Sequence, residues 1–345
     1  MKTPLLSIIV PVYNNPSSLT TILNRILNQG FKDFELIVVD DGSTDSTPQE
    51  LHKLANHKNV SVVTQENKGP AAARNTGLTL ANGSYIMFMD ADDDFEDDML
   101  SVMTASIQAN GDDMVACGWK SYYTSGQGYS ELSPGAEAVK GTEKQLKIYV
   151  VRSLGNNGVL YNLWNKIFRS EIIKTNNLLF REDVSFGEDL LFILNYLEHS
   201  KSIRIIPNAL YKYHVGSTGS VFKKSSLEPK YRYINAEGLN KFIGTIHNNQ
   251  ELDDLTQWVL WRWLLSYWMI VSSSSLPYSR KIALLRLPVS GQPRLASSAR
   301  YVGLKKWLIE RFVYVMRFSP YVSFAGSWLL SLTKNLGKQV KLVNT

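Results

Sequence analysis

The chain has 345 residues, of which 44% are hydrophobic and 11% aromatic, so it can bury a large core and is long enough for about two domains. A single cysteine excludes an intramolecular disulfide and agrees with a cytoplasmic location. No recognised nucleic-acid-binding motif accompanies the net charge of +6, so we do not expect a nucleic acid as partner.

The first predicted element is a buried strand near the N-terminus. Residues Leu6 to Val12 are mostly leucine or β-branched, and the run ends at Tyr13 and Asn14. It is too short, and too soon interrupted by Pro11, to be the apolar part of a secretory signal. We therefore expect a strand whose carboxyl end carries polar side chains.

A second apolar run, from Leu36 to Val39, ends in Asp40 and Asp41. Both runs have the form of strands in a parallel sheet, which are buried on both faces. Ligands of such sheets bind beyond the carboxyl ends of the strands. The polar residues just after each run are therefore candidate binding residues.

The most acidic part of the chain follows a third apolar run. Residues 86–94 read IMFMDADDD and bring Asp90 and Asp92 to the end of a predicted strand. Carboxylates held this close repel one another unless a divalent cation or the start of a helix stabilises them. The alternative to a cation is the segment from Phe95 to Ala109, a plausible helix whose positive N-terminal end favours the preceding acidic residues.

Three strand ends that carry carboxylates and an aromatic side chain favour a nucleotide site with a metal over three unrelated helix starts. Five segments, in the same order, also resemble the motifs of the family 2 glycosyltransferases. They are PVYNN (11–15), VDDGSTD (39–45), NKGPAAARNTG (67–77), MDADDD (89–94) and GEDLLF (187–192). The resemblance implies the α/β fold class, with a Rossmann-like GT-A catalytic domain over residues 1–222 that binds a nucleotide-diphosphate sugar, usually a UDP-sugar.

In that family the ends of the first strands bind the nucleoside. The resemblance gives Asp41 a hydrogen bond from the uracil base, and it assigns the rest of the nucleoside site to Pro11, Val12, Tyr13, Asn67 and Arg74. The residue types agree with these roles, since an aromatic face stacks on a base, a carboxylate accepts an imide N–H and a guanidinium suits phosphates. The alternative for Arg74 is an ordinary solvated position on the helix predicted from AAARNTGLTLA.

The resemblance also makes Asp92 the direct ligand of a divalent metal and puts Asp90 near the ribose and the metal's waters. Mg²⁺ or Mn²⁺ suits oxygen ligands and would also bind the diphosphate. His214, in LYKYHVGSTGSV, is a second candidate ligand, because relatives often have a polar residue there that closes over the diphosphate. The alternative for His214 is an ordinary strand position.

The catalytic assignment depends on the segment GEDLLF. Gly187 is typical of the residue before a helix, which puts Glu188 and Asp189 in the first turn of that helix. By resemblance, Asp189 is the general base of an inverting transferase, which takes the proton of the acceptor hydroxyl as that oxygen attacks the anomeric carbon. The alternative is that both acids only stabilise the helix start.

Charge divides the chain near residue 222. Residues 1–222 contain 19 basic and 25 acidic residues, whereas residues 223–345 contain 18 basic and 6 acidic ones. We expect residues 223–345 to form a mainly helical accessory region. Its tryptophans and the basic, amphipathic stretch from Leu304 to Arg317 favour contact with an anionic membrane surface, and the alternative is packing on protein. The segment WVLWRWLLSYWMIV is too short to span a membrane and contains Arg262.

The sequence thus predicts an inverting glycosyltransferase that moves a sugar from a UDP-sugar to a hydroxyl of a surface glycan. We expect a lipid-linked acceptor and a cytoplasmic enzyme attached to the inner face of the membrane. One alternative is a non-catalytic glycan- or membrane-binding relative. Another is a haloacid-dehalogenase-like phosphatase, although Asp40 and Asp41 are adjacent rather than spaced as in its DxDGT motif. The sugar, the acceptor hydroxyl and the oligomeric state do not follow from the sequence.

Overall fold

The computed structural model describes residues 3–54, 57–123, 128–215, 228–244, 249–274 and 276–277. The chain forms two compact units, Met1–Val221 and Phe222–Thr345. The division falls at the point in the sequence where the charge balance changes. All five motifs lie in the first unit.

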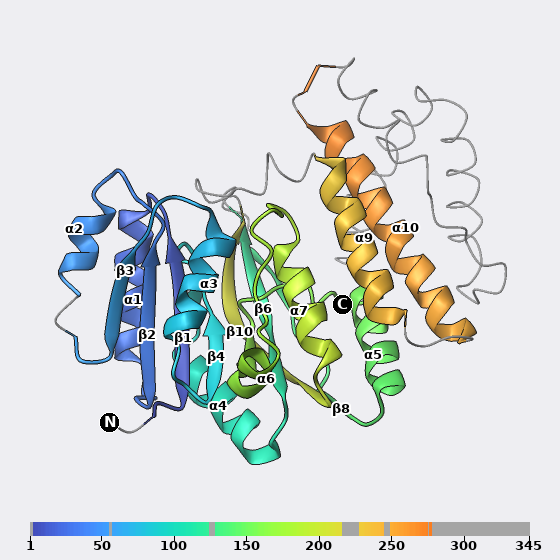
Figure 1. The fold of residues 1–345 in the computed structure, drawn as a ribbon, viewed down its shortest axis with the longest axis horizontal. Coiled ribbons are helices and arrows are strands. Elements are labelled where there is room, and N and C mark those ends of the chain that lie inside the picture. The colour runs from blue at the N-terminus through green and yellow to red at the C-terminus, as the bar shows by residue number, and fades with distance from the viewer. Residues whose placement is uncertain are drawn as a thin grey trace. The chain divides into compact units, whose positions relative to one another are not determined.

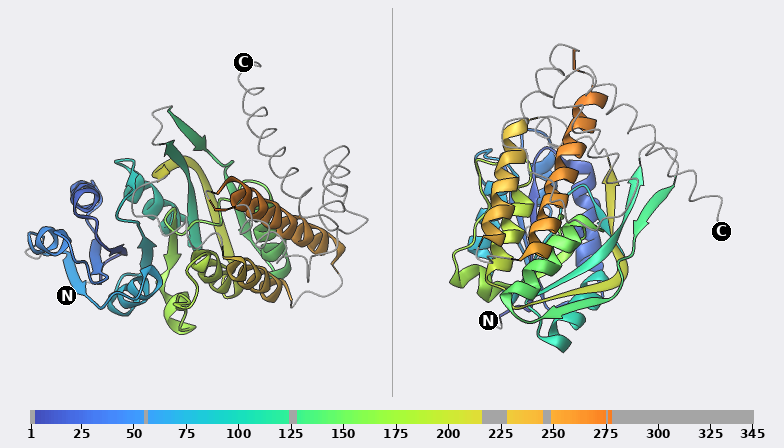
Figure 2. Two further views of the ribbon diagram at one scale, coloured as in Figure 1. Left: turned by 90° about the horizontal axis from the view of Figure 1, so that it is seen from above. Right: turned by 90° about the vertical axis from the view of Figure 1, so that its right-hand side faces the viewer.

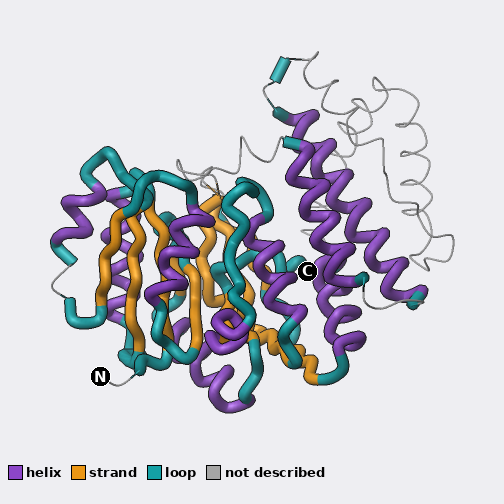
Figure 3. The backbone as a smooth tube through the Cα atoms, in the orientation of Figure 1, coloured by secondary structure: helices purple, strands orange, loops and turns teal. Residues whose placement is uncertain are grey.

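The first unit is built on one ten-stranded sheet (Figure 1). Its strand order is β3-β2-β1-β4-β9-β6-β10-β5, with β7 beside β6 and β8 beside β10. Figure 3 distinguishes these strands from the helices in the same view. The strands are β1 (Leu6–Val12), β2 (Phe34–Asp40), β3 (Val60–Thr64), β4 (Tyr85–Phe88), β5 (Asp94–Phe95), β6 (Met114–Tyr123), β7 (Tyr129–Leu132), β8 (Glu137–Lys140), β9 (Lys166–Arg169) and β10 (Ser202–Val215).

The predicted parallel strands are confirmed, because β1 has the predicted bounds and pairs in parallel with both β2 and β4. The sheet is nevertheless mixed. β9 lies between β4 and β6 and pairs antiparallel with both. Since β6 also pairs in parallel with β10, the strands β4, β6 and β10 run in the same direction as β1 and β2. The carboxyl ends of these five strands therefore lie at the same end of the sheet.

Helices cover both faces of this sheet. In Figure 1, α3, α6 and α7 lie in front of it, and Figure 2 shows α1 on the opposite side. Buried side chains of α1 and α4 pack in one core with alternate strand residues such as Ile8 and Val38. The helices of this unit are α1 (Pro16–Asn28), α2 (Thr47–His52), α3 (Pro70–Leu80), α4 (Met99–Asn110), α5 (Glu143–Gly155), α6 (Ser170–Thr175) and α7 (Glu188–Glu198).

The helix predicted to start at Phe95 begins later than expected. Asp94 and Phe95 form β5, which pairs antiparallel with β10, and α4 begins only at Met99. No acidic residue lies in the first turn of α4. A helix start is therefore the wrong explanation for the carboxylates that precede β5, because they lie at a strand end.

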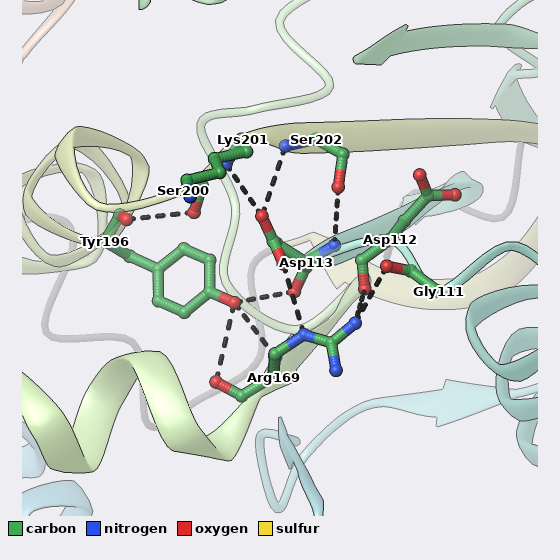
Figure 4. Close-up of polar contacts among 8 residues, drawn as sticks. All are labelled: Gly111, Asp112, Asp113, Arg169, Tyr196, Ser200, Lys201 and Ser202. Carbon is green, nitrogen blue, oxygen red and sulfur yellow. Dashed lines mark hydrogen bonds and ion pairs between the residues drawn. The ribbon is translucent and has the colours of Figure 1, made fainter. Parts of the chain in front are cut away.

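A polar network joins three strands at the other end of the sheet, where β6 and β10 begin (Figure 4). The Arg169 guanidinium binds the Asp113 carboxylate at 3.1 Å and donates to Gly111 O at 2.8 Å. The other oxygen of that carboxylate accepts the N–H groups of Lys201 and Ser202 at 2.7 and 3.2 Å. The network therefore ties the beginnings of β6 and β10 to the end of β9.

Replacing Arg169 by methionine is expected to lower the free energy of unfolding by about 1.5–3 kcal/mol, because hydrogen bonds to charged groups are lost from partly buried carbonyl and carboxylate oxygens. Arg181→Met is the matched control, since Arg181 makes an exposed ion pair with Asp183 and should contribute less than about 0.5 kcal/mol. Urea denaturation measures both variants. Equal losses would show that the network adds no particular stability.

The described part of the second unit contains α9 (Pro229–Ile243) and α10 (Gln250–Ser273). α10 begins after Asn249, whose side chain accepts the Leu252 N–H at 3.2 Å, and includes the whole of WVLWRWLLSYWMIV. Within the described residues, no helix combines the length and the apolar character needed to cross a bilayer. The stretch from Leu304 to Arg317, predicted to be amphipathic, lies outside the described residues.

Candidate active site

The carboxyl ends of β1 and β2 lie side by side. The two strands pair Pro11 with Val39, and the Asp41 N–H donates to Val12 O at 2.9 Å. Tyr13 is next in the chain, and 48% of its surface is exposed. The residues predicted to line a uracil base therefore lie beside Asp41 and include an exposed aromatic ring.

The Asp41 carboxylate is a buried acceptor that organises the following loop. Its Oδ1 accepts hydrogen bonds from Gln65 Nε2 at 2.8 Å and from the Lys68 N–H at 2.9 Å, and its Oδ2 accepts the Gly69 N–H at 2.8 Å. An ionised carboxylate offers about four acceptor positions. One position is thus left for a further donor, such as an imide N–H. Because Asp41 is only 3% exposed, that donor must pack directly against it.

Gly42 brings the loop of Asn67 against the end of β2. Its φ is +73°, and a Cβ at this position would lie 2.9 Å from the Asn67 backbone nitrogen. Glycine is the residue that meets both conditions. The Asn67 side chain is exposed beside this turn and is available to a nucleoside bound there.

Arg74 connects two parts of the candidate site. It lies on α3, is 5% exposed, and binds Asp90 Oδ1 through Nη2 at 3.0 Å. Its Nη1 binds Asp189 Oδ1 at 3.0 Å and Glu188 Oε1 at 3.3 Å. One guanidinium therefore joins the acidic segment after β4 to the start of α7. The solvated-surface alternative for Arg74 is wrong, because its side chain is buried among three carboxylates.

Burial and charge shift the pKa values in this cluster. Burial opposes the charge of Arg74, but the three carboxylates outweigh it and raise its pKa, so the guanidinium stays protonated. Burial also raises the pKa of Asp189 to about 7, against the attraction of Arg74. The Asp189 side chain is still 25% exposed. A partly accessible carboxyl that titrates near neutral pH suits a general base.

The raised pKa of Asp189 also affects stability. The folded protein binds this proton more tightly than the unfolded chain, in which the pKa of aspartate is near 3.8. The stabilising contribution is complete below pH 3.8 and is lost as the pH rises through about 7. The ionised form that catalysis needs is therefore the less stable form of the folded protein.

Gly187 and Asn75 position the acids at the start of α7. Gly187 has a φ of +86° and precedes the helix, which confirms the predicted helix start. Asn75, next to Arg74 on α3, donates to Phe180 O at 3.0 Å and accepts the Phe180 N–H at 2.8 Å. The Phe180 ring stacks on the Phe192 ring of α7, with 4.1 Å between the ring centroids. α3 therefore holds both the segment before α7 and the carboxylates at its start.

Asp93 is a residue of the site that sequence reasoning did not single out. It is 6% exposed, and its carboxylate accepts the Tyr211 hydroxyl and the His214 N–H, each at 3.0 Å. The same hydroxyl accepts the Asp90 N–H at 3.4 Å. Burial raises the pKa of Asp93, and the charges of Asp90 and Asp92 raise it further. Asp93 thus connects the acidic segment to β10, and only its place in the run DDD could have drawn attention to it.

Asp92 and His214 lie on adjacent segments. The antiparallel pairing of β5 with β10 puts Asp94 opposite Lys212, and the His214 N–H donates to the carboxylate of Asp93, which follows Asp92. His214 belongs to β10, as the strand alternative predicted, and its imidazole is exposed and stacks on Tyr122 at 5.6 Å between ring centroids. Its role as a metal ligand stays a prediction.

Among the described residues, no three histidine, cysteine, aspartate or glutamate side chains are arranged to hold a metal ion by themselves. The carboxylates of Asp90 and Asp92 nevertheless suit a cation that also binds the phosphates of a substrate. Mg²⁺ is usually held by one or two carboxylates together with substrate phosphates and waters. Asp90 and Asp92 are carboxylates of this kind.

Lys166 is a buried charge that also belongs to the surroundings of Asp189. It is 0% exposed, and its Nζ donates to Val159 O at 2.9 Å, to Asn165 Oδ1 at 2.7 Å and to Asn162 O. Burial lowers the pKa of Lys166 to about 7, while three oxygen acceptors suit the three N–H bonds of the ammonium form. That charge opposes the rise in the pKa of Asp189.

Residues 7–175 match the family model for Glycosyl transferase family 2. The chain is 31% identical to the uncharacterized glycosyltransferase EpsJ of Bacillus subtilis over 211 residues, which are 61% of this chain and 61% of EpsJ. It is 29% identical to the poly(ribitol-phosphate) β-N-acetylglucosaminyltransferase TarS of Staphylococcus aureus, over 71% of this chain and 42% of TarS. The match thus spans less than two thirds of the length of these relatives.

Solved structures share the fold. The structure of S. aureus TarS 1–349 in complex with UDP-GlcNAc has a TM-score of 0.70 at 23% identity and covers 95% of this chain and 92% of that one. The mannosyltransferase PcManGT from Pyrobaculum calidifontis, in complex with GDP-Man and Mn²⁺, has a TM-score of 0.51 at 18% identity and covers 96% and 88% of the two chains. At these identities the likeness concerns the fold alone.

Proposed function

Because the chain belongs to glycosyl transferase family 2, we propose that it is an inverting glycosyltransferase that moves a sugar from a UDP-sugar to a hydroxyl of a surface glycan. The observation that supports this best is the guanidinium of Arg74, which binds Asp90 and Asp189 at 3.0 Å each. Arg74 thereby brings Asp90, which is assigned to binding of the UDP-sugar, and Asp189, which is assigned to proton removal, into one cluster.

The UDP part of the donor would bind at the ends of β1 and β2. The exposed ring of Tyr13 is free to stack on the base, and Asp41 has an acceptor position left for its imide N–H. Asn67 would contact the nucleoside from the neighbouring loop. The UDP-GlcNAc complex of TarS supports uridine as the nucleoside.

A divalent cation would be held by Asp92, with Asp90 beside it and His214 as a further ligand. When bound, Mn²⁺ or Mg²⁺ stabilises the charge that develops on the leaving diphosphate. The Mn²⁺ in the PcManGT complex supports this choice of metals. Asp93 would keep the acidic segment in place through its hydrogen bonds to β10.

Asp189 would act as the general base. Its ionised carboxylate accepts the proton of the acceptor hydroxyl while that oxygen bonds to the anomeric carbon and the bond from this carbon to the diphosphate oxygen breaks. Attack from the face opposite the diphosphate inverts the configuration, so an α-linked donor gives a β-linked product. Arg74 orients the carboxylate and limits the rise of its pKa, which keeps a fraction of the base ionised at neutral pH.

The proposed acceptor is a hydroxyl of a growing, lipid-linked surface glycan. TarS, named for transfer to poly(ribitol-phosphate), supports a polymeric acceptor. The basic second part of the chain would attract the protein to an anionic membrane surface on the cytoplasmic side. Together these features suit an enzyme that extends a glycan while it is attached to the membrane.

Slow hydrolysis of the donor tests the function without knowledge of the acceptor. The full-length protein is incubated with Mn²⁺ and a panel of UDP-sugars, and the released UDP is measured. We expect release from one or a few UDP-sugars, and its loss when EDTA removes the cation. Inorganic phosphate released from simple monoesters, without UDP, would favour the phosphatase. Donor binding without any UDP release would favour the non-catalytic relative.

A further inference from the structure

Three aromatic side chains form a row across neighbouring strands. β10 pairs His214 with Tyr122 of β6, and β6 pairs Tyr122 with Tyr129 of β7. The ring centroids are 5.6 Å apart for His214 and Tyr122, and 5.2 Å apart for Tyr122 and Tyr129. His214, Tyr122 and Tyr129 together form an aromatic row.

The aromatic row is accessible. Tyr129 is 51% exposed, His214 is exposed and Tyr122 is half-buried. Because neighbouring strands lie about 4.8 Å apart, the row extends about 10 Å across the sheet. It presents partly exposed rings together with two phenol hydroxyls and an imidazole. Such a surface offers apolar contact and hydrogen bonds at the same time.

The row lies on the sheet face that carries the proposed base. Cys117 of β6 belongs to the core formed with α1 and α4, and Trp119 packs on that core. Since side chains alternate along a strand, Tyr122, three residues after Trp119, points to the other face. Figure 1 shows α3 and α7 on that face, and these helices carry Arg74 and Asp189.

The row begins at the proposed metal segment. The His214 N–H donates to Asp93 Oδ1 at 3.0 Å, and Asp93 is next in the chain to Asp92. A path from the acidic segment therefore runs through the Asp93–His214 hydrogen bond to Tyr122 and Tyr129. A chain-like ligand that lies on the row would have one end beside the acidic segment.

The charges beside the row are balanced. Lys120 and Lys212 bind the two oxygens of the Glu96 carboxylate at 2.7 and 2.9 Å. The Lys120 ammonium also lies 5.8 Å from the centroid of the Tyr129 ring. The carboxylate of Glu131, opposite Lys120 on β7, is a second negative charge beside these two ammonium groups. A surface with equal numbers of both charges suits a neutral saccharide better than a phosphate group.

We propose that the aromatic row binds sugar rings of the acceptor glycan. The proposal rests on the glycosyltransferase function proposed above. Sugar rings have apolar C–H faces and hydroxyl edges, so they pack against the tyrosine rings while their hydroxyls bond to the two tyrosine hydroxyls. The row holds the acceptor chain where it leads away from the acidic segment.

Saturation-transfer difference NMR of the full-length protein with UDP and Mn²⁺ tests the proposal. The probes are three neutral disaccharides, namely lactose, cellobiose and chitobiose. We expect the wild-type protein to bind at least one of them, and we expect Tyr122→Ala and Tyr129→Ala each to weaken that binding about fivefold or more, since each variant loses ring contact and a hydroxyl. Unchanged UDP affinity by calorimetry shows that the variants are folded.

Tyr123→Ala is the matched control, because Tyr123 is 38% exposed, follows Tyr122 in β6 and points to the opposite face. It should leave disaccharide binding unchanged. If an alanine variant does not fold, Tyr122→Leu and Tyr129→Leu keep the bulk and remove the hydroxyl and the ring. Equal binding by row variants and wild type, or wild-type binding of none of the three sugars, overturns the proposal. UDP release by the wild-type protein would in either case leave the proposed function standing.

Discussion

Replacement of Asp189 by asparagine is expected to lower the rate of sugar transfer and of donor hydrolysis about 10²–10⁴-fold, which is the usual contribution of a general base. Asparagine keeps the size of the side chain and can still accept a hydrogen bond from Arg74, but it takes up no proton. UDP affinity should therefore stay the same. Initial rates of UDP release and calorimetric titration with UDP measure the two quantities.

Glu188→Gln is the matched control for this variant. Glu188 precedes Asp189 on the same turn of α7 and binds the same nitrogen of Arg74 at 3.3 Å, but its side chain is less exposed, at 14% against 25%. We expect a loss below about tenfold for Glu188→Gln. Near-normal turnover of Asp189→Asn together with a large loss for Glu188→Gln would assign the base to Glu188 instead.

The pH dependence of kcat/KM gives a second readout of the same base. Because burial raises the pKa of Asp189 to about 7, the wild-type value should rise about tenfold per pH unit below pH 7 and level off above it. The residual activity of Asp189→Asn should lack this ascending limb. A wild-type limb near pH 4 would mean that the active base is a solvated carboxylate.

Replacement of Asp92 by alanine is expected to abolish the metal-dependent part of UDP binding. The Asp92 carboxylate is lost as a ligand, so the protein binds the cation more weakly and the cation contributes less to diphosphate binding. UDP affinity in the presence of Mn²⁺ should fall at least about tenfold, or about 1.4 kcal/mol. In EDTA the variant and the wild type should bind UDP equally. Calorimetry with and without Mn²⁺ makes the comparison.

Asp97→Ala is the control for Asp92, because Asp97 follows in the same acidic stretch and its side chain is 94% exposed. It should leave Mn²⁺-dependent UDP binding unchanged. If Asp92→Ala keeps the wild-type affinity in Mn²⁺, Asp92 is not a metal ligand. A loss of equal size in Asp97→Ala would instead indicate a general effect of negative charge on the cation.

The sequence was sufficient for the architecture of the donor-binding half. Buried runs such as Leu6 to Val12 have the composition of central parallel strands, and the order of the five motifs implied the GT-A fold, which the likeness to TarS confirms. The start of α7 after Gly187 was also predictable, because glycine before acidic residues is a local signal.

Contacts between distant segments were not predictable from local patterns. Arg74 and Asp189 are 115 residues apart in the chain, and nothing in AAARNTG indicates that the guanidinium turns toward α7. Asp94 lies in a strand rather than at a helix start because β10 pairs with it. Local residue propensities do not indicate that pairing. The burial of Lys166 was not predictable either, because it depends on β9 lying between β4 and β6.

The proposed mechanism requires that one bound cation joins Asp92 to the donor diphosphate, with Asp189 facing the transferred sugar from the other side. A crystal structure of the full chain with UDP and Mn²⁺, with anomalous diffraction recorded at the manganese edge, tests it most directly. We expect one manganese peak in contact with the Asp92 carboxylate and the phosphate oxygens, and an Asp189 carboxylate that faces the same space. Manganese bound away from Asp92, or an Asp189 side chain directed away from the diphosphate, would contradict it.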